Sequence, residues 1–163
     1  MSFLLDTNII SEGAKPRPDP GVMEWLASVD EEDLFLSVVS LAELRHGIER
    51  MDKGARQAGL DIWLTEQLAP RFEERLLSID SVTADLWGRI VNRAQGAGRP
   101  MGAMDAFIAA HAQQHELTLV TRNISDFEAT GIRLFNPWTK GKPDDSRCPV
   151  CSLFLGSAKR GID

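Results

Sequence analysis

The sequence has only two cysteines, Cys148 and Cys151, and both lie near its C-terminal end. A disulfide framework is therefore excluded, and a chain of 163 residues is long enough to bury a core without such cross-links. The CPVC pair follows no strand and opens no clear helix, which argues against a thioredoxin-like site. One pair also supplies only half of a structural zinc site, so we interpret both cysteines as incidental to function.

Long apolar runs are also absent, and none could span a bilayer. The first thirteen residues carry no basic segment, and Asp6 interrupts their only apolar run, so neither a signal peptide nor a membrane anchor is expected. These absences predict a soluble, cytoplasmic protein with no membrane partner.

An excess of basic residues is missing as well, since the formal net charge is −6. Residues 1–138 hold thirteen Lys/Arg against twenty-one Asp/Glu. Binding of phosphates without a metal normally requires a basic face. A polyanionic substrate would therefore need cations from solution.

Short apolar runs alternate with amphipathic helical stretches along the chain. The predicted strands lie at 3–5, 34–38, 75–79, 117–121 and 132–135, and the predicted helices at 20–29, 40–51, around 59–72, 81–95 and 103–115. Strands separated by helices favour parallel pairing, so we expect an α/β fold with a parallel-sheet α/β/α sandwich over residues 1–138. Residues 139–163 show no periodicity and are expected to form a tail outside the core.

Acidic residues occupy strand ends and helix starts, the positions where parallel sheets bind ligands. Asp6 ends the first strand, and Asn123 and Asp126 follow the strand at 117–121. Glu43 and Asp105 are predicted in the first turns of their helices. Each acid alone has a structural alternative, because Asp6 can cap a helix and Ser40-x-x-Glu43 has the spacing of a capping box.

Taken together, the acids favour a ligand-binding site over separate structural roles, because the predicted sandwich brings them to one edge of the sheet. Carboxylates this close repel one another unless they share a cation. Mg²⁺ or Mn²⁺ suits oxygen ligands, and no His/Cys set for zinc lies nearby.

Four segments in order, "LLDTNIISE", "VVSLAELRHGIER", "MDAFIAAHA" and "LVTRNISDF" followed by "NPW", resemble the motifs of PIN-domain ribonucleases, specifically VapC-type toxins of type II toxin–antitoxin systems. The resemblance covers about residues 3–138. It implies a metal-dependent endoribonuclease in which Asp6, Glu43 and Asp105 bind the cation and act in catalysis. The fourth ligand is left open between Asp126 and Asn123, because Asn123 stands where the family often has an acid.

The expected chemistry is hydrolysis of RNA phosphodiesters by a metal-activated water. Candidates for contacting the substrate are Thr7, Ser40, Arg45 and Arg122. For the two arginines, a solvated surface charge is an equally good interpretation. Trp25, Trp63 and Trp87 are expected in the core or in a dimer contact, and the histidines are expected to be structural.

Two alternatives come from other classes of function. A haloacid-dehalogenase-like phosphatase needs a second Asp two residues after the first. This alternative is disfavoured because position 8 is Asn. A catalytically silent PIN-fold binding protein is disfavoured by the three retained acids.

The resemblance also implies a cognate antitoxin and a homodimer as partners. We expect an apolar contact surface around Trp25, Leu26, Ile62, Trp63 and Leu64.

Overall fold

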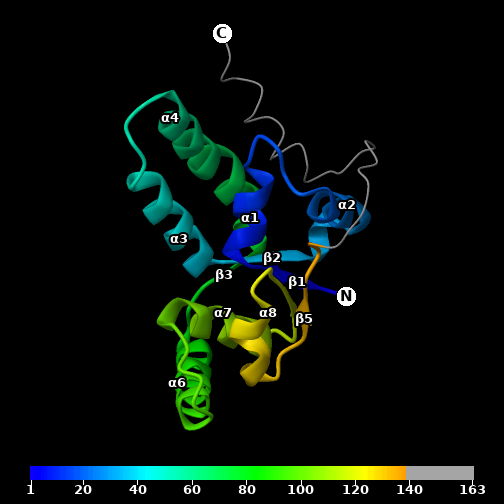
Figure 1. Ribbon diagram of the computed structural model, residues 1–163, viewed down its shortest axis with the longest axis vertical. Helices are drawn as coiled ribbons and strands as arrows, with labels where there is room; N and C mark the ends of the chain where they lie inside the picture. Colours follow the sequence, from blue (N-terminus) through cyan, green and yellow to red (C-terminus); the bar gives the residue numbers. More distant parts are fainter. Residues whose placement is uncertain (139–163) are drawn as a thin grey trace.

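The computed structural model describes residues 1–138. The predicted tail at 139–163, with Cys148 and Cys151, lies outside the described residues. The described residues contain a five-stranded parallel sheet with the strand order β3-β2-β1-β4-β5 (Figure 1). Its strands are β1 (Phe3–Leu5), β2 (Leu34–Ser37), β3 (Leu76–Leu77), β4 (Thr118–Val120) and β5 (Leu134–Phe135).

Eight α-helices connect and cover these strands within residues 1–138: α1 (Thr7–Gly13), α2 (Pro20–Ser28), α3 (Val38–Glu49), α4 (Ala55–Ile62), α5 (Ala69–Arg71), α6 (Ser81–Gly96), α7 (Ala103–Gln114) and α8 (Ile124–Phe127). A π-helical stretch, Trp63–Leu68, joins α4 to α5. The five predicted strands and five longer helical stretches are confirmed to within a few residues. The short helices α1 and α8 were not predicted, because neither is long enough to show an apolar period.

Two hydrophobic clusters lie on opposite faces of the sheet, as strand alternation requires. Leu5 and Val120 belong to the cluster formed with α1, α2 and the α4–α5 segment. Leu4 and Leu119 belong to the cluster formed with α6 and α7. The predicted α/β/α sandwich is therefore confirmed, and β1 lies at its centre.

The start of α3 corrects one prediction. This helix begins at Val38, and Ser37 caps it by accepting a hydrogen bond from the Val39 N–H over 3.0 Å. Glu43 is consequently in the second turn and is not part of a capping box with Ser40. The Ser40 hydroxyl is buried and has no hydrogen-bond partner among the described residues.

The expected apolar contact surface is also wrong for most of its members. Leu26, Trp63 and Leu64 are buried core residues, and Trp25 packs edge-on against Phe3 with ring centroids 5.2 Å apart. Ile62 alone of the five is largely exposed, at 49%. These side chains therefore stabilise the fold. None of the helices in residues 1–138 combines the length and apolar character needed to cross a membrane.

Candidate active site

The strand order places the predicted acids at one edge of the sheet. Strand β1 is flanked by β2 on one side and by β4 on the other, so the chain changes direction across the sheet at β1. Asp6 follows β1 directly, Asp126 lies in α8 after β4, Glu43 lies on α3 after β2, and Asp105 lies in the first turn of α7. This is the edge at which open parallel sheets bind ligands.

Asp6 is buried, and its carboxylate is held by three neighbours. Oδ1 accepts the Thr7 N–H over 2.8 Å, which caps α1. Oδ2 accepts the Thr121 hydroxyl over 2.7 Å and the Asn8 side-chain amide over 3.3 Å. The capping role and the place in the acid group thus coexist in one side chain.

Glu43 is joined to the same group through Thr7. The Thr7 hydroxyl donates a hydrogen bond of 2.9 Å to Glu43 Oε1, so this threonine links the N-terminus of α1 to α3. Thr7 was predicted to contact the substrate, and the structure gives its hydroxyl a partner within the protein. Its direct effect is to orient Glu43.

Burial and the charges of neighbouring carboxylates raise the pKa of Asp6, Glu43 and Asp105. Burial raises the pKa of Asp6 against the lowering hydrogen bonds from Thr121 and Thr7, and the charge of Asp126 raises it further. Burial also raises the pKa of Glu43, with a further contribution from Asp6. The pKa of Asp105 rises to about 6 through burial and the charges of Asp6, Glu43 and Asp126.

This set of donors fits a divalent cation. Within residues 1–138, no Lys or Arg forms an ion pair with any of these four carboxylates. Repelling carboxylates with no cation from the protein make an oxygen-rich site that suits a hard divalent ion. As placed, no three acidic, histidine or cysteine side chains of the described residues close around a single point. A cation bound at this edge would therefore take several of its ligands from water, as Mg²⁺ commonly does.

The two candidates for the fourth acidic position, Asp126 and Asn123, differ in their surroundings. The charge of Asp126 raises the pKa of both Asp6 and Asp105. For Asn123 the recorded contact is through the backbone, whose N–H donates to the Thr121 hydroxyl over 3.0 Å. The exposed Asn123 side chain has no hydrogen bond recorded among the described residues.

The two predicted arginines differ in their surroundings. Arg45 forms ion pairs with Asp61 on α4 at 2.6 Å and with Glu49 at 3.4 Å. These pairs favour the structural interpretation of Arg45. The Arg122 side chain instead lies over the Trp138 ring.

Sequence reasoning missed Asn8 and Thr121, whereas it predicted a structural role for His111, as for the other histidines. Asn8 and Thr121 surround Asp6, and Thr121 follows β4 as Asp6 follows β1, so the same strand-end argument could have found it. His111 on α7 is fully buried and bridges two other elements. Its Nε2 donates to the Ser78 carbonyl over 3.1 Å, which leaves Nδ1 to accept the Ser37 hydroxyl over 3.0 Å.

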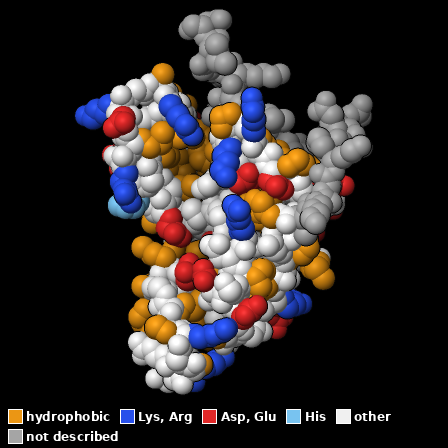
Figure 2. All heavy atoms as spheres, viewed as in Figure 1, with side chains coloured by type: hydrophobic (Ala, Val, Ile, Leu, Met, Phe, Trp, Pro, Cys, Tyr) orange, Lys and Arg blue, Asp and Glu red, His pale blue; other side chains and the backbone are white. Residues whose placement is uncertain are grey.

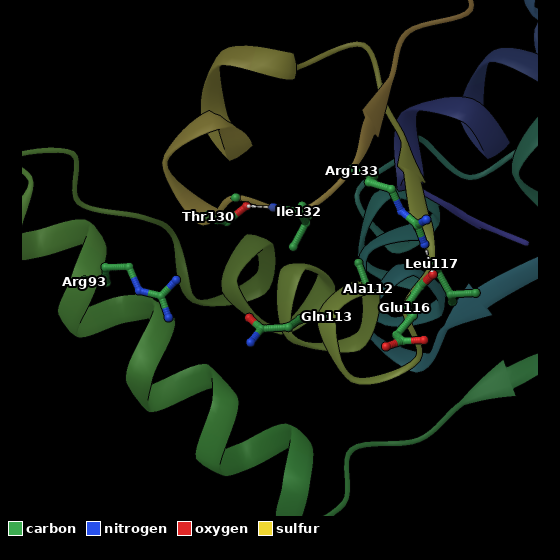
Figure 3. A pocket seen from close by; sticks show the side chains of 9 residues that line it. Arg93, Ala112, Gln113, Glu116, Leu117, Thr130, Ile132 and Arg133 are labelled. Atoms are coloured by element: carbon green, nitrogen blue, oxygen red, sulfur yellow. Dashed lines mark hydrogen bonds between the residues drawn. The ribbon is translucent and has the colours of Figure 1, made fainter.

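Figure 2 shows acidic side chains across the middle of the face seen there, with Lys and Arg side chains gathered above them. The described surface also has a hollow of about 580 Å³ elsewhere, between α6, the C-terminal end of α7 and the segment before β5 (Figure 3). Arg93, Glu116 and Arg133 line it, together with Gln113 and Thr130. This hollow lies at the opposite end of β4 from the acids. The group formed by Asp6, Glu43, Asp105 and Asp126 is the better candidate site, because several carboxylates at one place can bind a divalent cation.

Comparison with known proteins shows which proteins this chain is similar to. Residues 3–132 match the PIN domain family. The chain is 39% identical to toxin FitB of Neisseria gonorrhoeae, over 83% of this chain and 98% of the relative. It is 36% identical to VapC ribonuclease Y4jK of Sinorhizobium fredii, over 83% and 97% of the two chains. The crystal structure of FitAcB from Neisseria gonorrhoeae has a TM-score of 0.80 and 38% identity, over 85% and 99% of the chains.

Proposed function

The chain belongs to the PIN domain family, and from this premise we propose that it is a divalent-metal-dependent endoribonuclease that acts as the toxin of a toxin–antitoxin pair. The observation that carries the proposal is the group of four carboxylates, Asp6, Glu43, Asp105 and Asp126, which has no cationic partner from residues 1–138. The names of the relatives as toxin and ribonuclease support the same activity.

We assign the binding of the cation to Asp6, Glu43 and Asp105, with Asp126 as the fourth acid. Mg²⁺ or Mn²⁺ is the ion that an all-oxygen donor set favours. When bound, such an ion acidifies water and offsets the charge that develops on a phosphate under attack.

The protein's own contribution is to hold the carboxylates in position. Thr7 supports two of them, since its N–H binds Asp6 and its hydroxyl binds Glu43. Thr121 and Asn8 fix the other oxygen of Asp6. The Asp105 carboxylate has no hydrogen-bond partner among the described residues and is repelled by the other acids, a repulsion that a bound cation would relieve. Ser40, whose buried hydroxyl has no partner, remains a candidate for contacting the substrate.

The partners follow from the same assignment. The substrate is RNA, the inhibitor is a cognate antitoxin, the protein works in the cytoplasm, and a homodimer is the proposed assembly. The nuclease domain spans residues 1–138. The alternative is a catalytically silent PIN-fold protein. It is disfavoured because it does not explain why mutually repelling carboxylates are grouped at one place.

Chelation tests the nuclease assignment. The purified protein is expected to cleave single-stranded RNA in Mg²⁺ or Mn²⁺ and to lose this activity in excess EDTA, because phosphate attack then lacks the cation. Restoring each ion separately identifies the preferred metal. Undiminished cleavage in EDTA would contradict the metal-dependent mechanism.

Expression in bacteria tests the assignment as a toxin. The wild-type protein is expected to arrest growth, and co-expression of the protein encoded beside it is expected to relieve the arrest. Asp105→Asn, matched in expression level, is the control and should be harmless. Equal harmlessness of both proteins, with no inhibitor bound to either, would contradict this part of the proposal.

A further inference from the structure

Arg122 differs from most arginines with recorded contacts in residues 1–138. Five of them pair with carboxylates: Arg45, Arg71, Arg75, Arg89 and Arg99. Arg122 is exposed and directly follows Thr121, whose hydroxyl donates a hydrogen bond to Asp6. It nevertheless has no carboxylate partner among the described residues, although four acids lie at the same sheet edge.

The backbone of Arg122 is fixed to the acid group. Its N–H donates to Asn8 Oδ1 over 3.3 Å. The Asn8 amide in turn donates to Asp6 Oδ2 over 3.3 Å and to the Thr121 hydroxyl over 3.2 Å. One asparagine side chain therefore sets the position of Arg122 relative to Asp6.

The guanidinium is held by an aromatic ring. Its central carbon lies 5.7 Å from the centroid of Trp138, within the range of a cation–π contact. The Trp138 ring packs against the hydrophobic cluster under α1 and α2, and the backbone N–H of Trp138 donates to Asn136 Oδ1 over 2.9 Å. A ring anchored in this way restricts the long arginine side chain and reduces the entropy lost when the guanidinium binds a ligand.

We propose that Arg122, oriented by Trp138, binds a phosphate of the RNA next to the one that is cleaved. This inference rests on the proposed function, because it assigns a substrate contact to that same site. A guanidinium presents a planar set of N–H donors that matches phosphate oxygens. Because no carboxylate of the described residues pairs with its N–H groups, the Arg122 guanidinium over Trp138 is available to a phosphate. Trp138 is a positioning residue that acts through Arg122.

The test compares Arg122→Ala, Arg122→Lys, Trp138→Ala, Trp138→Phe and the double alanine variant. Cleavage of a short single-stranded RNA of mixed sequence gives kcat and KM, and fluorescence anisotropy gives the affinity for the same RNA. Arg93→Ala is the matched control, since it removes an exposed arginine on α6, away from the acids. Thermal melting identifies any variant that fails to fold.

Loss of Arg122 is expected to raise KM and weaken RNA binding roughly tenfold, with kcat within about twofold of wild type. The salt dependence of log affinity should fall by about 0.7, the value for one phosphate contact on a single strand. Trp138→Phe should bind RNA more tightly than Trp138→Ala, because a phenyl ring retains a cation-binding face. The double variant should be no worse than Arg122→Ala alone.

Unchanged KM, affinity and salt dependence in Arg122→Ala would overturn the inference, as would additive losses in the double variant. Trp138→Phe keeps the test decisive if Trp138→Ala does not fold. Weakened binding in Arg122→Ala combined with a wild-type protein that never cleaves RNA would support the phosphate contact and contradict the nuclease assignment. The two proposals are thereby tested separately.

Discussion

Among the acids at this sheet edge, Asp105 is the one whose pKa is raised by the charges of all three others. Its pKa rises from 3.8 to about 6, first through burial and then through the charges of Asp6, Glu43 and Asp126. Between these two pH values the folded state binds more protons at Asp105 than the unfolded state does. The free energy of unfolding of the metal-free protein therefore falls, through this group, as pH rises through the window.

Asp105→Asn is accordingly expected to be more stable than wild type in excess EDTA at neutral pH, by about 1 kcal/mol once solvent screening of this half-buried group is allowed for. The advantage should shrink towards about pH 5, where Asp105 of the wild type becomes protonated. Melting temperatures of both proteins across this range provide the measurement. The comparison cancels the contribution of His111, whose pKa is lowered by burial and which acts in the opposite direction. An advantage that grew towards acid pH would contradict the account.

Single substitutions test the choice between Asp126 and Asn123 as the fourth position. Asp126→Ala is expected to weaken Mn²⁺ binding severalfold, because its charge acts on both Asp6 and Asp105. Asn123→Ala should change the affinity little, since the recorded contact of Asn123 is made by its backbone. Calorimetric titration of the two variants gives the comparison, and a larger loss in Asn123→Ala would reverse the assignment.

At the scale of elements, the N-terminus of α3 differs from the helix start that the sequence predicts. The spacing Ser40-x-x-Glu43 is a valid local signal, yet Ser37 forms the cap because β2 ends there and its hydroxyl also donates to His111. The strand ends and acid positions were predictable from short-range patterns. The link between α7 and α3 through His111 was not, since it joins positions 74 residues apart.

Two serine variants test this assignment of the cap. Ser37→Ala is expected to lower the free energy of unfolding by about 2 kcal/mol, because it removes the cap and leaves a buried imidazole nitrogen unpaired. Ser40→Ala should stay within about 0.5 kcal/mol of wild type, since its hydroxyl has no partner to lose. Urea unfolding measures the free energy of unfolding of both variants. A larger loss in Ser40→Ala than in Ser37→Ala would favour the capping box of Ser40 and Glu43 instead.

The end of α7 offers an independent test away from the acids. Glu116 has a positive φ of 53° and follows the helix in a Schellman turn, in which Leu117 N–H donates to the Ala112 carbonyl over 2.9 Å. Glu116→Gly should raise the free energy of unfolding by about 1 kcal/mol, because glycine adopts this conformation without steric cost. Glu116→Ala removes the same charge and should give no gain. Equal stabilisation by both variants would assign the effect to charge instead.

At the scale of the whole molecule, the fold brings four distant parts of an acidic chain to one sheet edge. The α/β/α sandwich, its parallel sheet and the position of Asp6, Glu43 and Asp105 at one sheet edge followed from the sequence, since alternating strands and helices determine where strand ends meet. The supporting contacts of Asn8 and Thr121, the buried side chains of α2 and the π-helical segment, and the Arg122–Trp138 pair required the folded structure. They depend on contacts between residues far apart in the chain.

The central claim is that the acid group cleaves RNA with the help of a divalent cation. It is tested most directly by measuring the rate of RNA cleavage by wild type and by Asp6→Asn over the same range of Mn²⁺ concentrations. Asp6→Asn keeps an oxygen that can accept the Thr7 N–H and thus preserves the α1 cap, which circular dichroism can verify. The account predicts that the wild-type rate rises with Mn²⁺ and that the folded variant stays at background at every concentration. A folded Asp6→Asn protein that cleaves RNA at the wild-type rate would contradict it.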